Sequence, residues 1–198
     1  MEPLFIKEFL PNQLLNLCYS YSIIKFSNKK LFKIDSQTNS LIGEYGDYLM
    51  ETIMDMSTSV VEQNVGKKLW PTYSYFRIYD KGSDLKVHKD RESCEYTVAL
   101  CLGADPMDKP YEIFIGEEDK DSDYKYYNKE NYNRYRIDYK FSMLPNNALI
   151  FKGMDKFHWR EICTHDHFIT VFLHYVDQDG PYKDFKFDKR QILGEKND

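Results

Sequence analysis

Apolar residues in the first third of the chain recur at helical spacing. In "LPNQLLNLCYSYSII", Pro11 stands where it can open a helix, and an apolar face follows: Leu14, Leu17, Cys18 and Tyr21. After the polar segment 35–40, "YLMETIMDMSTSVVEQNV" predicts a second, longer helix. Its apolar positions are Leu49, Ile53, Met56, Val60 and Val61. The methionines of this stretch are interpreted as core filler.

From Trp70 onward the pattern becomes the short-range alternation typical of β-strands. "PTYSYFRIYDKG" is rich in aromatic residues and predicts a strand that ends in a turn at Lys81 and Gly82. Six further short strands are predicted, separated by turn residues: "DLKVHKD", "CEYTVALCLG", "YEIFIG", "NALIFKG", "KFHWREI" and "HFITVFLHYV". Helices followed by about seven short strands predict an antiparallel sandwich or barrel with helices packed on its outside.

Residues 117–140 interrupt this pattern with a polar tract rich in tyrosine, lysine, asparagine and aspartate. One interpretation is a solvated loop or a long exposed hairpin. The other is a lid or a substrate-contact loop, because long loops in compact β domains often carry recognition. The sequence leaves both open.

Composition narrows the classes of partner. The formal net charge of −5 and the pI of about 5.6 argue against nucleic acid and anionic membranes as partners. No apolar run approaches the roughly 20 residues of a membrane helix, and the start lacks a basic segment before a long apolar one, so we expect a cytoplasmic protein. The four cysteines show no Cys-x-x-Cys spacing and are expected to be reduced, buried thiols: Cys18, Cys94, Cys101 and Cys163.

The segment "DLKVHKD" carries the first candidate chemistry. His88 and Asp90 stand two positions apart, so on a strand they project from the same face. Such a pair is half of a facial metal site, in which two histidines and one carboxylate hold the ion. A surface hydrogen bond explains an isolated pair equally well. His158 can complete the triad if its strand lies beside that of His88; a histidine buried in the core is the alternative.

The order of these features resembles the iron- and 2-oxoglutarate-dependent oxygenases, in particular their small, prolyl-hydroxylase-like members. Two separated blocks carry the resemblance over roughly residues 70–190, "PTYSYFRIYDKGSDLKVHKDRESCEYTVALCLG" and "HWREICTHDHFITVFLHYVDQDG". The resemblance implies a double-stranded β-helix, or jelly roll, supported by N-terminal helices, in one domain over 1–198 with its β core at 69–190. It also implies Fe(II) held by His88, Asp90 and His158, with 2-oxoglutarate and O2 as cosubstrates.

The chain departs from this family at the position that anchors 2-oxoglutarate. Members commonly carry an Arg or Lys about nine or ten residues after the second metal histidine, whereas this chain has His165-Asp166-His167-Phe168 there. Arg160 is the preferred substitute, because it shares the face of His158 on a regular strand and a guanidinium grips a carboxylate in a bidentate manner. The other possible anchors are His167 and Arg77, and the possible hydrogen-bond donors are Tyr79 and Tyr75.

A second departure lies in a turn. Relatives usually have Pro-Gly-Asp where this chain has Pro145-Asn146-Asn147, and since Asn tolerates a positive φ we expect the shape to be kept. Elsewhere, His174 on its apolar strand is expected to be structural. Glu95 is expected either to support a ligand or to lie on the surface.

The resemblance implies a dioxygenase that hydroxylates a substrate the sequence does not identify. A peptidyl proline or another amino-acid residue is the first expectation, and a small metabolite is the second. The alternative is a non-enzymatic jelly-roll or cupin-like binding protein, or a virion structural protein, with a vestigial metal site. The missing late Arg or Lys keeps this alternative open.

Overall fold

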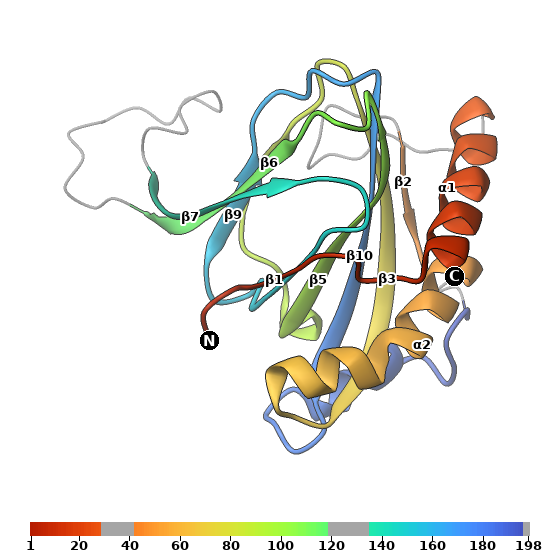
Figure 1. Cartoon of the computed structure of the whole chain (residues 1–198). Helices are drawn as coiled ribbons and strands as arrows, with labels where there is room; N and C mark the ends of the chain where they lie inside the picture. The colour runs from red at the N-terminus through yellow and green to blue at the C-terminus, as the bar shows by residue number, and fades with distance from the viewer. Residues whose placement is uncertain (29–41, 119–134, 196–198) are drawn as a thin grey trace.

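The computed structural model describes residues 1–28, 42–118 and 135–195, and these residues form two antiparallel sheets with helices against one of them (Figure 1). The helices are α1 (Asn12–Ser27) and α2 (Tyr48–Val65). The larger sheet has the order β1 (Leu4–Ile6), β8 (Ala148–Phe151), β5 (Tyr96–Asp105), β10 (His167–Asp177), β3 (Leu69–Asp80), β2 (Ile42–Tyr45). The smaller has the order β4 (Leu85–His88), β9 (Phe157–Arg160), β6 (Tyr111–Glu118), β7 (Tyr135–Met143). Short 3-10 helices are η2 (Glu92–Cys94) and η4 (Lys183–Lys189).

The chain winds back and forth between these two sheets. From β3 to β6 the strands alternate between the larger and the smaller sheet, and after the β6–β7 pair β8, β9 and β10 alternate again. This winding produces a double-stranded β-helix, which confirms the predicted fold class. All seven strands that the sequence predicted are present.

Alternation along the central strands divides the core in two. On β5, Val98 and Leu100 pack toward the helices, whereas Ala99 and Cys101 belong to the cluster between the sheets. Both faces of β5 are therefore buried, and its sequence is accordingly apolar from Val98 to Leu102. The helices cover only the outer face of the larger sheet (Figure 1). The inner face is left to line the interior of the barrel.

The predicted apolar faces of the two helices were partly wrong. Leu17 on α1 and Met56 on α2 are 55% and 61% exposed. The buried side of α2 is made instead by Met50, Glu51, Ile53, Met54, Ser57 and Val61. It includes a carboxylate because the Glu51 Oε1 atom accepts a hydrogen bond from the buried Arg190 at 2.6 Å. Polar residues paired in this way break the hydrophobic pattern without breaking the packing.

Three strands and the C-terminal 3-10 helix η4 were not predicted. β1 pairs with β8, and β2 pairs with β3, so two strands from the supposedly helical N-terminal part belong to the larger sheet. β7 pairs antiparallel with β6 and takes up the last residues of the polar tract 117–140, so these residues form an exposed edge strand, which agrees with the hairpin interpretation and not with a solvated loop. Residues 119–134 and the polar segment 35–40 lie outside the described residues, and the predicted lid stays a prediction.

Two simpler expectations can be checked directly. The four cysteines are all unpaired and buried, as predicted. Among the described residues, no helix combines the length and the apolar character needed to cross a membrane.

The turn before β8 depends on Asn146, whose φ of 65° lies in the left-handed region, as expected for an Asn that replaces Gly. Its side chain also accepts a hydrogen bond from the Leu10 backbone N–H and donates one to the Leu10 carbonyl oxygen, both at 2.8 Å. Asn146→Gly keeps the backbone freedom and loses both bonds, so we expect the free energy of unfolding to fall by about 2 kcal/mol. Urea denaturation measures this loss; Asn146→Ala is expected to lose more, and an unchanged midpoint for both variants contradicts the argument.

Candidate metal centre

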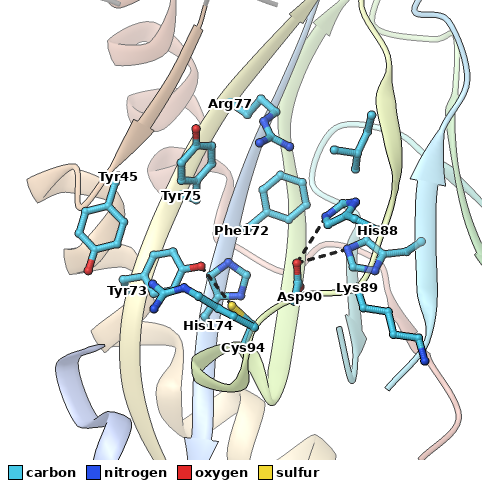
Figure 2. A pocket seen from close by; sticks show the side chains of 13 residues that line it. Tyr45, Tyr73, Tyr75, Arg77, His88, Lys89, Asp90, Cys94, Phe172 and His174 are labelled. Atoms are coloured by element: carbon cyan, nitrogen blue, oxygen red, sulfur yellow. Dashed lines mark hydrogen bonds and ion pairs between the residues drawn. The ribbon is translucent and has the colours of Figure 1, made fainter. Parts of the chain in front are cut away.

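The two histidines that the sequence singled out meet on neighbouring strands. His88 at the end of β4 and His158 in β9 are direct partners in the antiparallel ladder, and their ring centroids are 4.2 Å apart. Asp90 follows β4, where its backbone N–H donates to the Gly153 carbonyl oxygen at 3.0 Å. Its Oδ1 lies 3.4 Å from His88 Nε2 and 3.6 Å from His158 Nε2 (Figure 2). The ligand atoms of the three residues all lie within 4.8 Å of one another, so the predicted convergence occurs.

Backbone carbonyls fix the orientation of both imidazoles. His88 Nδ1 lies 2.8 Å from the Lys86 carbonyl oxygen, and His158 Nδ1 lies 3.3 Å from that of Lys156. A carbonyl oxygen only accepts, so each Nδ1 carries a proton and each Nε2 keeps its lone pair. Both lone pairs belong to the nitrogens that face Asp90. This is the tautomer that a metal ion requires from histidine.

Burial and the neighbouring side chains set the protonation of His88 and Asp90. Burial lowers the pKa of His88, and the neighbouring His158 acts in the same direction, so the neutral imidazole is favoured. Burial alone would raise the pKa of Asp90, but the neighbouring imidazoles, His158 before His88, outweigh it and hold that pKa well below its usual range. A buried carboxylate beside an unprotonated imidazole is a donor set that a divalent cation stabilises.

The second carboxylate oxygen of Asp90, Oδ2, is positioned by Thr97 and by the space beside Gly153. Thr97 Oγ1 donates to Asp90 Oδ2 at 3.2 Å and lies 3.1 Å from His174 Nδ1. Gly153 leaves the space that this carboxylate occupies, because a Cβ there would lie 2.1 Å from Asp90 Oδ2 and 2.8 Å from Thr97 Oγ1.

Gly153→Ala is therefore expected to push the Asp90 carboxylate out of place and to weaken binding of a divalent cation about 10-fold or more. Equilibrium dialysis against Fe(II) or Co(II) under anaerobic conditions measures the effect. Thermal unfolding of the metal-free variant separates it from a general loss of stability. Wild-type affinity in the folded variant would show that the contact does not constrain the carboxylate.

A cavity of about 470 Å³ opens beside the three residues. Besides the triad it is lined by Tyr45, Tyr73, Tyr75, Arg77, Leu85, Lys89, Arg91, Cys94, Phe172 and His174. Most of this lining comes from the inner face of the larger sheet and from the segment that follows β4 (Figure 2). The cavity thus has a cluster of metal-ligating side chains on one wall and an aromatic wall facing it.

Arg77 brings a buried positive charge into this cavity. Its side chain is 3% exposed, and the guanidinium carbon lies 4.8 Å from the centre of the Tyr75 ring and 5.7 Å from that of Phe172. Figure 2 shows the guanidinium above Phe172. Arg77 is the ladder partner of Thr170 on β10, the strand on which the related oxygenases were expected to carry their anchor.

The structure does not place the preferred anchor, Arg160, among the residues that line the cavity. Arg160 is fully buried, and its Nη1 donates to the carbonyl oxygens of Tyr111 and Glu112 at 3.0 and 3.1 Å. Tyr79 is buried between the two arginines, with its ring centre 5.6 Å from the Arg160 guanidinium and 5.9 Å from that of Arg77. Arg160 shares the inward face with His158 as expected, but Tyr79 packs between it and Arg77.

His167, the second possible anchor, also lies away from the cavity lining. Its Nε2 is 3.0 Å from the hydroxyl of Tyr19 on α1, on the outer side of the larger sheet. Glu95 does not lie on the surface, since it is 4% exposed and accepts a hydrogen bond from the Asp177 backbone N–H.

The sequence reasoning missed several residues of the cavity. His174 was expected to be structural, yet it lines the cavity together with Phe172, two positions before it on β10. The period-two spacing of these residues was a usable pattern. Tyr45, Tyr73 and Arg91 were missed because only the tertiary fold brings β2 and the segment after β4 to the same opening.

The fold is similar to that of several solved iron- and 2-oxoglutarate-dependent oxygenases. The chain is similar to a prolyl-4-hydroxylase from Pseudomonas putida, with a TM-score of 0.56 and 11% identity over 87% of this chain and 91% of that one. It is similar to the non-heme α-ketoglutarate-dependent carbocyclase SnoK from nogalamycin biosynthesis, with a TM-score of 0.62, 11% identity and coverage of 89% and 80%.

A third similar structure is EctD from S. alaskensis, crystallised with 2-oxoglutarate and 5-hydroxyectoine, with a TM-score of 0.60, 11% identity and coverage of 88% and 72%. No protein-family model matches the chain, and no curated protein sequence does. At these identities the likeness is one of fold.

Proposed function

We propose that this chain is an Fe(II)- and 2-oxoglutarate-dependent oxygenase. The observation that carries the proposal is the convergence of His88, Asp90 and His158 at a cavity with a buried arginine on its wall. Two proteins of the same fold support it, one named as an α-ketoglutarate-dependent carbocyclase and one crystallised with 2-oxoglutarate. An apolar, aromatic cavity with a few converging polar groups is the usual form of a small-molecule site.

The three residues fit Fe(II). Two neutral imidazoles and one carboxylate, arranged on one side of the ion, form the facial triad of non-heme iron enzymes and leave the other side open for ligands. When bound, Fe(II) together with 2-oxoglutarate and O2 supplies the oxidising power to hydroxylate a C–H bond. The chain itself fixes the two Nε2 lone pairs and keeps Asp90 ionised.

Arg77 is our proposed anchor for the distal carboxylate of 2-oxoglutarate. Of the two arginines among the described lining residues, Arg77 is 3% exposed, whereas the Arg91 side chain is 51% exposed. A guanidinium can grip a carboxylate through two N–H groups, and burial strengthens the pair. The charge usually supplied by β10 would then come from its neighbour β3.

We propose that the substrate is either an amino-acid residue in a peptide or a small metabolite. The prolyl-4-hydroxylase among the similar structures supports the peptide, and the carbocyclase and EctD support a small molecule. Tyr45, Tyr73 and Lys89 are the lining residues from which substrate contacts would come.

Anaerobic addition of Fe(II) and then 2-oxoglutarate tests the proposal. An oxygenase of this class is expected to develop a weak visible charge-transfer band from the bound pair, and His88→Ala is expected to lack it. Admission of O2 should then yield succinate, and the yield should rise with the true substrate. A wild-type chain that binds the metal but shows neither band nor succinate would instead be a binding or structural protein with a vestigial site.

A further inference from the structure

A second group of possible metal ligands adjoins the triad and shares Asp90 with it, and its other two members have no part in the proposed function. The ligand atoms of Asp90, Cys94 and His174 also all lie within 4.8 Å of one another. Cys94 and His174 are 1% and 4% exposed, and both line the cavity. Figure 2 shows the Cys94 sulfur beside the His174 ring, with Asp90 between them and His88. A thiol, an imidazole and a carboxylate therefore meet next to the first group.

The carboxylate of Asp90 presents one oxygen to each group. Oδ1 is the atom that faces the Nε2 atoms of His88 and His158. Oδ2 accepts the hydrogen bond from Thr97, whose hydroxyl oxygen in turn contacts His174 Nδ1. A carboxylate with its oxygens divided in this way is arranged to bridge two cations.

The same hydrogen bonds decide which nitrogen of His174 is free to bind. Thr97 has one hydroxyl proton and donates it to Asp90, so its oxygen must accept the proton carried by His174 Nδ1. The lone pair of the neutral imidazole then resides on Nε2. His174 is thereby held in the same tautomer as the triad histidines, with a carboxylate behind the hydroxyl that orients it.

The charges near Cys94 do not oppose a cation. The nearest guanidinium, that of Arg91, stacks 4.5 Å from the centre of the Tyr73 ring, and the Tyr73 hydroxyl lies 3.1 Å from Cys94 Sγ. Both terminal nitrogens of Arg91 are bound to the carboxylate of Asp188, so its positive charge is compensated. A sulfur, a nitrogen and an oxygen donor together suit Zn²⁺ or Co²⁺, which accept thiolates readily.

We propose that Asp90, Cys94 and His174 form a second site, for a thiophilic divalent cation of the Zn²⁺ type, which is filled together with the first and shares Asp90 with it. Binding replaces the S–H bond of Cys94 by a sulfur–metal bond, and the thiol proton leaves to solvent. The inference relies on the proposed function only in that Asp90 also ligates the first ion.

Anaerobic titration of the metal-free chain with Co²⁺ tests this proposal. We expect two ions per chain and a thiolate-to-cobalt charge-transfer band in the near ultraviolet. Cys94→Ser is expected to bind one ion and to lose the band. The matched control is Cys163→Ser, which removes another buried cysteine that does not line the cavity and should keep both ions and the band. Circular dichroism confirms that each variant is folded.

Wild-type protein that binds a single Co²⁺, or a band that survives in Cys94→Ser, overturns the second site. His88→Ala separates the two proposals, because it should lose the first ion and keep the band. Loss of the band from His88→Ala would place Cys94 among the ligands of the first ion and would also overturn the inference. Suppose instead that Cys94→Ser binds as much metal as the wild type, and that both form the visible charge-transfer band with Fe(II) and 2-oxoglutarate. The second site then fails and the proposed function stands.

Discussion

Replacement of His88 by alanine is expected to weaken Fe(II) binding about 100-fold or more and to abolish succinate formation from 2-oxoglutarate. His88 supplies one of only three protein donors, and its Nε2 lone pair is directed at the ion by the Lys86 carbonyl oxygen. Loss of groups that merely orient a ligand already costs 10- to 100-fold in metal affinity, so loss of the ligand itself should cost at least as much. Anaerobic Fe(II) titration and a succinate assay measure both effects.

His167→Ala is the matched control for this variant. His167 is also a histidine at a strand terminus, but its ring contacts Tyr19 and does not line the cavity. It should bind Fe(II) like the wild type and turn over at the same rate. Equal Fe(II) affinity in His88→Ala and His167→Ala would mean that the triad does not hold the ion.

Replacement of Arg77 by methionine is expected to weaken 2-oxoglutarate binding by about 2–3 kcal/mol, roughly 30- to 150-fold, with little change in Fe(II) affinity. Methionine fills part of the space beside Tyr75 and Phe172 but removes the charge-assisted pair with the distal carboxylate. The 2-oxoglutarate affinity of Arg77→Lys should lie between those of the wild type and Arg77→Met, because an ammonium keeps the charge and loses the bidentate geometry. Titration of the charge-transfer band with 2-oxoglutarate gives each affinity.

Arg160→Met provides the comparison, because this guanidinium is also buried but binds the carbonyl oxygens of Tyr111 and Glu112. It should lower stability and leave the 2-oxoglutarate affinity of the folded protein unchanged. The opposite result, with affinity lost in Arg160→Met and kept in Arg77→Met, would transfer the anchor to Arg160. Unchanged affinity in both variants would exclude both arginines.

The central strands were predictable because each carries its own evidence. β3 and β10 are rich in aromatic and aliphatic residues over 12 and 11 positions and are followed by turn residues, so their pattern is recognisable without knowledge of their neighbours. β1 and β2 span only three and four residues, so their existence depends on the edges of β8 and β3 that they pair with. β7 is a largely exposed edge strand whose charged residues resemble those of a loop.

Some residues of the candidate site could likewise be predicted from the sequence, and others could not. His88 and Asp90 could be found from strand periodicity, and His158 from the resemblance together with a single strand pairing. The choice between Arg77 and Arg160 could not be made from sequence, because both stand on inward faces and Tyr79 separates them only once the barrel is formed. The direction of a long, flexible side chain is set by its neighbours and not by its parity on the strand.

The opposition of His88 and His158 within one β-ladder constrains how the proposed site can change. A slip of one residue between β4 and β9 would turn one imidazole to the far face of the sheet, so a change of length on either side of that pairing would separate the proposed ligands. Most of the facing wall of the cavity belongs to the other sheet, so its side chains can vary without altering this register.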